Sequence, residues 1–174
     1  MNSRKSAVSN SGPLIHLAKA GFLNILKELY SLVVPIEVTV EVVDKGKERG
    51  YADAVQVENA IKSGWIKVTS VQLTSEFNEF SEAAGPDLDL AEVKVICYAY
   101  KNDITALLDD DAARVFARRY GVEVRGSLGV LIEGLSEGRL SYEAAVSGLN
   151  KLSEVMYLSA GVYKTALMEL EKRI

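Results

Sequence analysis

Apolar and polar positions along the chain follow two different periods. Short runs rich in branched residues, each bounded by turn residues, predict buried strands. Between these runs, apolar residues recur every three or four positions, which predicts amphipathic helices. The predicted strands are residues 5–9, 32–34, 65–71, 104–108 and 121–125. The predicted helices are residues 13–21, 22–30, 36–46, 51–64, 91–101, 110–121, 127–138, 141–155 and 160–174, with a short helix or lid in 73–85.

Helix start and stop signals support several of these boundaries. Pro13 suits the first turn of a helix that Gly21 then ends. Asp89 and Glu92 have the spacing of a capping box at the start of the central helix. The segment 36–46 is rich in β-branched residues and would also fit a strand, but a proline before it and a glycine at its end favour a helix.

Strands and helices alternate along almost the whole chain, and the connections between them are short. This order predicts βαβ units, and therefore an α/β fold in which a three-layer α/β/α sandwich surrounds a mostly parallel central sheet. Ligand sites in such folds lie at the carboxyl ends of the strands. Because no repeat or interdomain linker is visible, we expect residues 1–174 to form a single domain, with a C-terminal helical extension from about residue 141.

Composition limits the classes of protein and partner. Apolar residues make up 48% of the 174 positions and charged residues 25%, which is ordinary for a globular protein. The net charge of −4 means that any nucleic acid must be held by a local basic patch or through a metal ion. Cys97 lies in an apolar helical run and is expected to be buried. No signal peptide or membrane-spanning run is evident, so we expect a cytoplasmic protein.

Acidic and amide side chains stand at corresponding places in this topology. Asn10 follows the first strand, Glu41 lies after the second, Glu92 begins the central helix, and Asp109 to Asp111 follow the fourth strand. If the sheet is doubly wound, the loops that carry these residues meet in one crevice. Crowded carboxylates repel one another, so the group needs a cation. Hard oxygen ligands without a Cys and His set favour Mg²⁺ or Mn²⁺ over zinc.

Four segments taken in order resemble a PIN domain. They read VSNSGPLIHLAKAG, VPIEVTVEV, LDLAEVKVICYA and LLDDDAARVFARRYGVEVRGSLGVLIEGLSEG, and the resemblance covers roughly residues 6 to 140. The chain is especially similar to small archaeal and bacterial PIN proteins related to VapC-type toxins. This resemblance implies an endoribonuclease that depends on Mg²⁺ or Mn²⁺, cleaves single-stranded or structured RNA and forms a homodimer. It also implies the toxin of a toxin–antitoxin pair, or a relative of one, with an antitoxin protein as partner.

The resemblance also assigns roles to residues. Glu41, Glu92 and Asp110 match the second, third and fourth acidic positions of the family and are the implied catalytic and metal-binding residues, with Asp109 as a further metal ligand. Asn10 matches the first position, which is usually Asp, although this branch includes members with Asn. An amide oxygen can bind a hard cation but carries no charge. We therefore expect weaker metal binding and slow or lost hydrolysis.

Substrate contacts are expected close to the acidic group. Ser127 matches a family position that often lines the crevice, and Arg114 and Arg118, with Arg119 and Arg125 near them, are the nearest basic residues for phosphate contacts. A flexible single strand can bend its phosphate toward a recessed ion, whereas a stiff duplex cannot. Single-stranded or looped RNA is therefore the expected substrate.

Each of these residues also has a simpler structural explanation. Glu92 completes a capping box, the aspartates suit a helix start, Glu41 fits a solvated helix face, and Asn10 fits a turn. His16, the single histidine, is expected to be a core or surface residue. Two rival functions remain open. One is a catalytically weak PIN-fold module that binds nucleic acid or protein, and the other is a receiver-type phosphoacceptor, for which a suitably placed lysine is missing.

Overall fold

A five-stranded sheet forms the centre of the computed structural model, which describes residues 3–174. The strand order is β3-β2-β1-β4-β5, and every neighbouring pair is parallel. This confirms the predicted α/β fold with a parallel sheet, and it places the third strand at an edge. The strands are β1 (Lys5–Ser9), β2 (Tyr30–Pro35), β3 (Ile66–Thr69), β4 (Thr105–Leu107) and β5 (Val124–Arg125).

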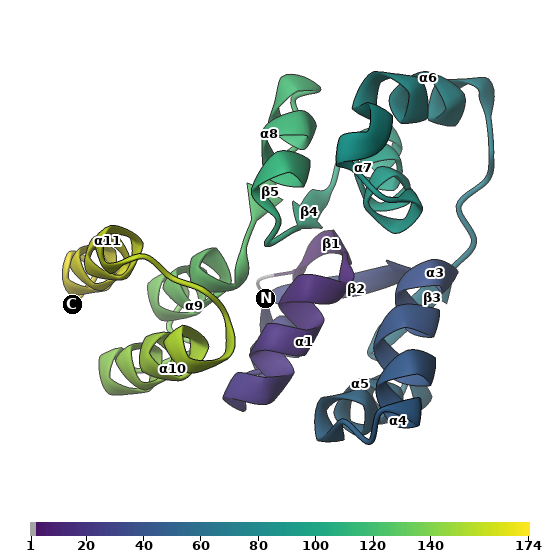
Figure 1. Ribbon diagram of the computed structural model, residues 1–174. Helices are drawn as coiled ribbons and strands as arrows, with labels where there is room; N and C mark the ends of the chain where they lie inside the picture. The colour runs from purple at the N-terminus through teal and green to yellow at the C-terminus, as the bar shows by residue number, and fades with distance from the viewer. Residues whose placement is uncertain (1–2) are drawn as a thin grey trace.

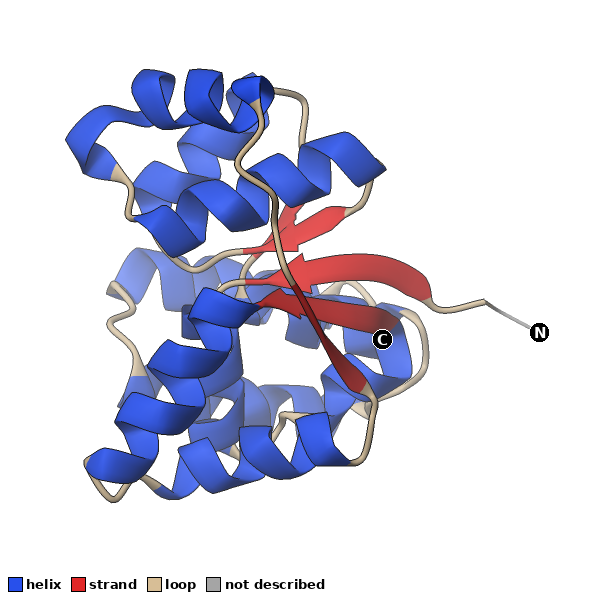
Figure 2. Cartoon of the chain, turned by 90° about the vertical axis from the view of Figure 1, so that its right-hand side faces the viewer, coloured by secondary structure: helices blue, strands red, loops and turns tan. Residues whose placement is uncertain are grey.

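Helices cover both faces of the sheet (Figures 1 and 2). In both views α6, α7 and α8 lie above the sheet, and α1, α5 and α10 lie below it. The buried apolar core lies between these layers, and it includes Cys97 as expected. The helices are α1 (Ser11–Ala20), α2 (Asn24–Leu29), α3 (Ile36–Thr39), η1 (Val40–Asp44), α4 (Lys45–Glu48), α5 (Ala52–Lys62), α6 (Ser75–Ala84), η2 (Gly85–Asp87), α7 (Leu90–Asn102), α8 (Asp111–Arg119), α9 (Ser127–Ser136), α10 (Tyr142–Val155) and α11 (Ala160–Glu171).

The ambiguous segment 36–46 is helical, as favoured, but it does not end at Gly46. One continuous helical rod runs through α3, η1 and α4 to Glu48, and η1 is a π-helical turn. Gly46 has no left-handed backbone conformation, and a Cβ atom there would lie 2.7 Å from the Cβ of Ala54. The glycine therefore allows α4 to pack closely against α5. The prediction that it ends the helix was wrong for this reason.

The acidic segment 73–85, for which a short helix or a lid was predicted, contains the helix α6. The Thr74 side chain caps it by accepting a hydrogen bond from the backbone of Phe77. Phe77 and Phe80 are buried, and the Phe80 ring lies 5.2 Å from that of Tyr100 and 4.4 Å from that of Tyr120. An aromatic cluster therefore joins α6 to α7 and α8.

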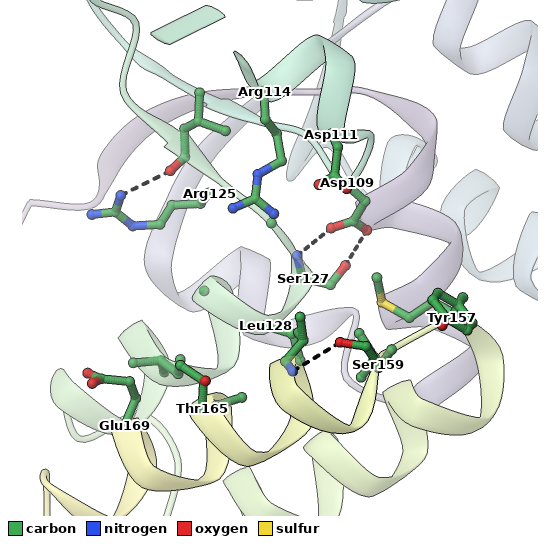
Figure 3. Close-up of a pocket in the computed structure, with 18 of the residues that line it drawn as sticks. Asp109, Asp111, Arg114, Arg125, Ser127, Leu128, Tyr157, Ser159, Thr165 and Glu169 are labelled. Carbon is green, nitrogen blue, oxygen red and sulfur yellow. Dashed lines mark hydrogen bonds between the residues drawn. The ribbon is translucent and has the colours of Figure 1, made fainter.

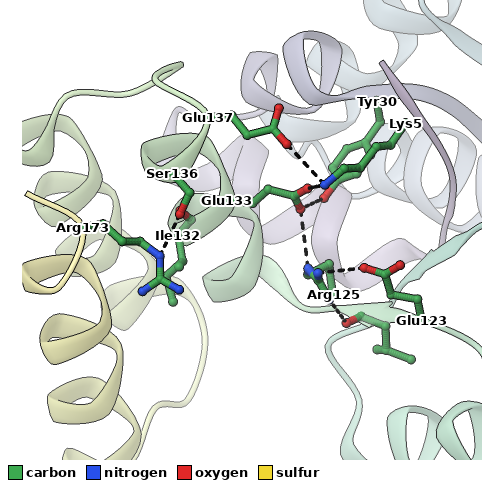
Figure 4. A network of polar contacts seen from close by, with 10 residues as sticks. Lys5, Tyr30, Glu123, Arg125, Ile132, Glu133, Ser136, Glu137 and Arg173 are labelled. Atoms are coloured by element: carbon green, nitrogen blue, oxygen red, sulfur yellow. Dashed lines mark hydrogen bonds and ion pairs between the residues drawn. The ribbon is translucent and has the colours of Figure 1, made fainter. Parts of the chain in front are cut away.

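A polar network joins α9 to the amino ends of the first two strands (Figure 4). The Glu133 carboxylate accepts hydrogen bonds from Lys5 Nζ at 2.5 Å and from the Tyr30 hydroxyl, and Arg125 Nε lies 3.5 Å away. Burial alone would raise the pKa of Glu133, but the bonds from Lys5 and Tyr30 outweigh it and hold that pKa below its usual value. The ionised carboxylate therefore stabilises the fold.

Replacing Glu133 by glutamine is expected to cost about 2 kcal/mol of unfolding free energy at pH 7, because the buried Tyr30 hydroxyl and Lys5 lose a charged partner. Since the pKa is depressed in the folded state, the wild-type advantage is complete above the unfolded pKa of about 4.3 and disappears as pH falls through the folded value. Urea unfolding between pH 7 and pH 3 measures this. Glu137→Gln, which removes only one exposed contact with Lys5, is the control. A wild-type advantage that does not change with pH would contradict the assignment.

Candidate functional site

The predicted site residues come together at the carboxyl ends of three neighbouring strands. The backbone N–H of Asn10 donates to the carbonyl of Leu107 at 3.0 Å, so the loop after β1 lies beside the loop after β4. The N–H of Leu108 donates to the carbonyl of Arg125 at 2.9 Å, which brings the loop after β5 to the same place. Asp109, Asp110 and Ser127 follow directly in these loops.

Asn10 is a buried polar residue that the fold does not explain. The residue is 9% exposed, and its Oδ1 atom has no hydrogen-bond partner among the described residues. Asn10 occupies the N-cap position of α1, yet its side chain makes no capping hydrogen bond. Since leaving a buried carbonyl oxygen unpaired is costly, the amide oxygen is available for a ligand.

Glu41 lies in the π-helical turn η1, and its side chain reaches the start of α1. The Ser11 hydroxyl donates to Glu41 Oε2 at 2.7 Å. A π turn inserts an extra residue into a helix and changes the direction of its side chains, and such turns are frequent at functional sites. The bond from Ser11 therefore ties Glu41 to the residue that follows Asn10.

Glu92 forms the predicted capping box at the start of α7. Its Oε2 atom accepts the N–H of Asp89 at 3.0 Å, and Asp89 Oδ1 accepts the N–H of Glu92 at 2.8 Å. Burial raises the pKa of Glu92, and the charges of Asp89, Asp110 and Glu41 raise it further. The carboxylates at positions 41, 92 and 110 thus repel one another, as expected for a group that a cation would stabilise.

Asp110 is the N-cap of α8, and its Oδ1 atom accepts the N–H of Ala113 at 2.9 Å. The carboxylates of Glu41, Glu92 and Asp110 share one pattern. Each is anchored through one oxygen, while the other oxygen accepts no hydrogen bond from residues 3–174. The structural explanations for Glu92 and Asp110 are therefore correct, but they use only half of each carboxylate.

Asp109 differs because both of its oxygens are engaged (Figure 3). Oδ1 accepts the backbone N–H of Ser127 at 2.6 Å, while Oδ2 accepts the Ser127 hydroxyl at 2.6 Å and lies 2.7 Å from His16 Nδ1. Burial alone would raise the pKa of Asp109, but the bonds from His16 and Ser127 outweigh it and lower that pKa. Asp109 thus joins α1, β4 and α9, and its buried carboxylate has less freedom to bind a metal than its neighbours.

The bond between His16 and Asp109 was not expected from the sequence. The two residues are 93 positions apart, and each fits its local pattern without the other. Gly12 is the one local sign of their contact, since a Cβ atom there would lie 3.3 Å from the Cβ of Asp109. Its lack of a side chain lets the first turn of α1 approach the loop after β4.

The residues present fit a hard divalent cation in their chemistry, since they offer one amide and three carboxylate oxygens. Within the described residues, however, no three Asp, Glu, His or Cys side chains form a group that could hold a metal ion as they stand. Glu41 and Asp110 are exposed, so their free oxygens can rotate without disturbing the core. Binding would therefore require these side chains to turn toward the unpaired oxygen of Asn10.

Beside this acidic group, a cleft of about 760 Å³ lies between α8, the loop after β5 and α11 (Figure 3). Asp109 and Ser127 line it, as do Arg114 and Arg118 from α8 and Arg125 from β5. The structure therefore places the predicted phosphate-binding arginines in the cleft that Ser127 also lines. Arg119 is not among the lining residues.

Comparison with known proteins gives one clear result. A family model described as a PIN domain matches residues 6–172. The match extends past the four sequence motifs and includes the whole of α10 and α11, as far as Lys172. No match was found among the curated proteins. No helix among residues 3–174 is both long and apolar enough to cross a membrane.

Proposed function

The chain belongs to the PIN-domain family, whose fold is of the nuclease type, and from this premise we propose that it is an endoribonuclease dependent on Mg²⁺ or Mn²⁺. PIN domains generally use divalent metal ions. The single observation that carries the proposal is the buried Oδ1 atom of Asn10, which has no hydrogen-bond partner among residues 3–174. It lies at the carboxyl ends of the strands, where three carboxylates, each anchored through one oxygen, repel one another. The proposal treats residues 1–174 as one PIN-like domain that the helices from about residue 141 extend.

In this proposal the metal ligands are Asn10, Glu41, Glu92 and Asp110. When bound, the ion supplies positive charge to the scissile phosphate and lowers the pKa of an attacking water. One of the three carboxylates accepts the proton of that water. Asp109 acts through its neighbours, because its bonds to His16 and Ser127 fix the loop from which Asp110 projects.

The proposed substrate is single-stranded or looped RNA. The amide oxygen of Asn10 is buried, so a phosphate must approach closely to reach an ion held there. A flexible strand can bend to do so, whereas an A-form duplex presents its phosphates on a stiff surface.

Incubation of the purified protein with labelled RNA tests the proposal. We expect a single-stranded RNA to be cleaved with Mn²⁺ present, little cleavage of a duplex of the same sequence, and none with excess EDTA. Wild-type protein that leaves RNA as intact as Asp110→Asn and Glu92→Gln variants do would contradict the nuclease proposal. Because Asn10 contributes no charge, the alternative in that case is a PIN-fold module that binds nucleic acid or protein without cleaving it.

The proposal includes kinship with VapC-type toxins, a homodimeric state and an antitoxin partner. Met168, about half exposed on α11, is an apolar side chain of the kind that a second copy would cover. Light scattering of the purified protein is expected to give twice the mass of 18.9 kDa. A monomer at all concentrations would remove the dimer from the proposal.

A further inference from the structure

The cleft beside the acidic group has two walls of different chemistry. On one side, α8 presents Arg114, Val115 and Arg118, which recur at helical spacing and face away from the buried side of that helix. On the other side lie the first turns of α11 and the segment before it, including Tyr157, Leu158 and Val162 (Figure 3). The volume of about 760 Å³ falls within the range of roughly 300–1,000 Å³ found for ligand sites.

Three carboxylates, those of Asp109, Asp111 and Glu169, and three arginines line the cleft, and two of the guanidinium groups form no ion pair among residues 3–174. Arg125 forms ion pairs with Glu123 and Glu133, and Glu169 forms ion pairs with Lys172 and Arg173. Arg114 and Arg118, in contrast, form no ion pair with a carboxylate in the part of the chain that the structure describes. Guanidinium groups bind phosphate oxygens through paired, charge-assisted hydrogen bonds.

The floor of the cleft brings Arg114 and Asp109 close to the backbone of Gly126. It is formed by the loop from Val124 to Gly129, and a Cβ atom at Gly126 would lie 3.0 Å from Arg114 Nη1 and 3.0 Å from Asp109 Oδ1. The Arg114 guanidinium therefore lies directly over this loop. A phosphate bound to it would sit beside Asp109 and Ser127, next to the acidic group at Asp110.

Tyr157 supplies the feature that separates a nucleotide from a simple anion. It is 91% exposed, although large aromatic side chains are usually at least partly covered. It lies between α10 and α11 and borders the cleft. Exposed aromatic rings beside a basic groove are the means by which proteins stack the bases of single-stranded nucleic acids.

We propose that this cleft binds one flank of a single-stranded RNA, with Arg114 and Arg118 on backbone phosphates and Tyr157 stacked on a base. The inference rests on the proposed function, and it adds α11 as a wall of the substrate site. A strand held in this way passes its next phosphate to the edge of the sheet where Asn10 and Asp110 lie.

Fluorescence anisotropy with a short, fluorescein-labelled oligouridylate tests this inference in EDTA, where cleavage is blocked. Arg114→Gln/Arg118→Gln is expected to weaken binding about tenfold or more. It is also expected to reduce the steepness of the slope of log K against log salt concentration by about 1.4, since two phosphate contacts are lost. Tyr157→Ala is expected to weaken binding about fivefold, at the low end for a base stack because the ring is so exposed.

Matched controls come from the other side of the sheet. Lys45→Gln/Arg49→Gln removes the same charge from α4 and its C-cap residue, and Tyr51→Ala removes a half-exposed tyrosine; neither is expected to change binding. In Figure 1, α4 and α8 lie on opposite sides of the sheet. Because the substituted side chains are largely on the surface, equal thermal unfolding temperatures will show that all variants fold.

The outcomes separate this inference from the proposed function. If wild type cleaves RNA but the cleft variants bind it as tightly as wild type, the inference is overturned and the nuclease proposal stands. If wild type does not cleave RNA but the cleft variants lose binding as expected, the inference stands and the nuclease proposal fails. If wild type binds no RNA, or if the variants alter only self-association in light scattering, the cleft is not an RNA site.

Discussion

Asp110→Asn is expected to lower the rate of Mn²⁺-dependent RNA cleavage by roughly a hundredfold or more, because a metal ligand loses its charge. The substitution is informative because of the second role of Asp110. Its Oδ1 atom caps α8, and asparagine caps helices about as well as aspartate. The variant therefore keeps the helix start and the shape of the side chain while it removes the charge.

Initial cleavage rates at saturating Mn²⁺, measured for wild type and Asp110→Asn, check this prediction. The control is Asp103→Asn, the same chemical change in the turn before β4. This turn lies at the amino end of the strand, whereas the acidic group lies at the carboxyl ends of the strands. Asp103 has a left-handed backbone with a φ of 51°, a conformation that asparagine tolerates well. Equal loss of activity in both variants, or in neither, would show that Asp110 has no special part in cleavage.

Asn10→Asp is expected to strengthen Mn²⁺ binding about tenfold, which corresponds to about 1.4 kcal/mol. The new carboxylate adds a charge at the buried position whose oxygen has no partner, and this charge attracts a divalent cation. Part of the gain is offset because the added charge also repels the carboxylates at positions 41, 92 and 110, and the charges at positions 41 and 110 already raise the pKa of Glu92. Without metal, the variant is therefore expected to be less stable than wild type.

Titration calorimetry with Mn²⁺ and thermal unfolding with and without Mn²⁺ measure both sides of this prediction. Mn²⁺ is expected to raise the melting temperature of Asn10→Asp by more than it raises that of wild type. The variant is also expected to cleave RNA faster than wild type. Asn78→Asp adds the same charge at an exposed position of α6 and is expected to change neither quantity. If Asn10→Asp binds Mn²⁺ no more tightly than wild type, Asn10 is not at the metal site.

Much of the fold could be predicted because it depends on local patterns. The alternation of strands and helices predicted the parallel sheet, and the spacing of Asp89 and Glu92 predicted the capping box that the structure contains. The errors come from contacts between distant elements. Gly46 looks like a helix end in sequence, but it is there because Ala54 on the next helix packs against it. The strand β5 is only two residues long, although the alternation predicted five.

The candidate site could be predicted only in part. The order of the motifs placed Asn10 and the acidic residues at one sheet edge, since parallel strands end together. The order of the motifs could not show that both oxygens of Asp109 accept hydrogen bonds from His16 and Ser127, whereas one oxygen of Asp110 accepts none. Nothing in the sequence indicates which hydrogen bonds each of two neighbouring aspartates forms. The α11 wall of the cleft was missed as well, since the C-terminal helices carry no sequence sign of a substrate contact.

Mn²⁺ binding in the absence of RNA is the most direct test of the central claim, which is that the strand edge around Asn10 holds a divalent cation. Titration calorimetry of wild type, Glu41→Gln and Asp110→Asn is the measurement, because each substitution removes one charge and keeps the side chain's size and its single anchoring bond. We predict that wild type binds Mn²⁺ and that each variant binds it at least tenfold more weakly. Equal Mn²⁺ binding by all three proteins, or no binding by wild type, would contradict the claim.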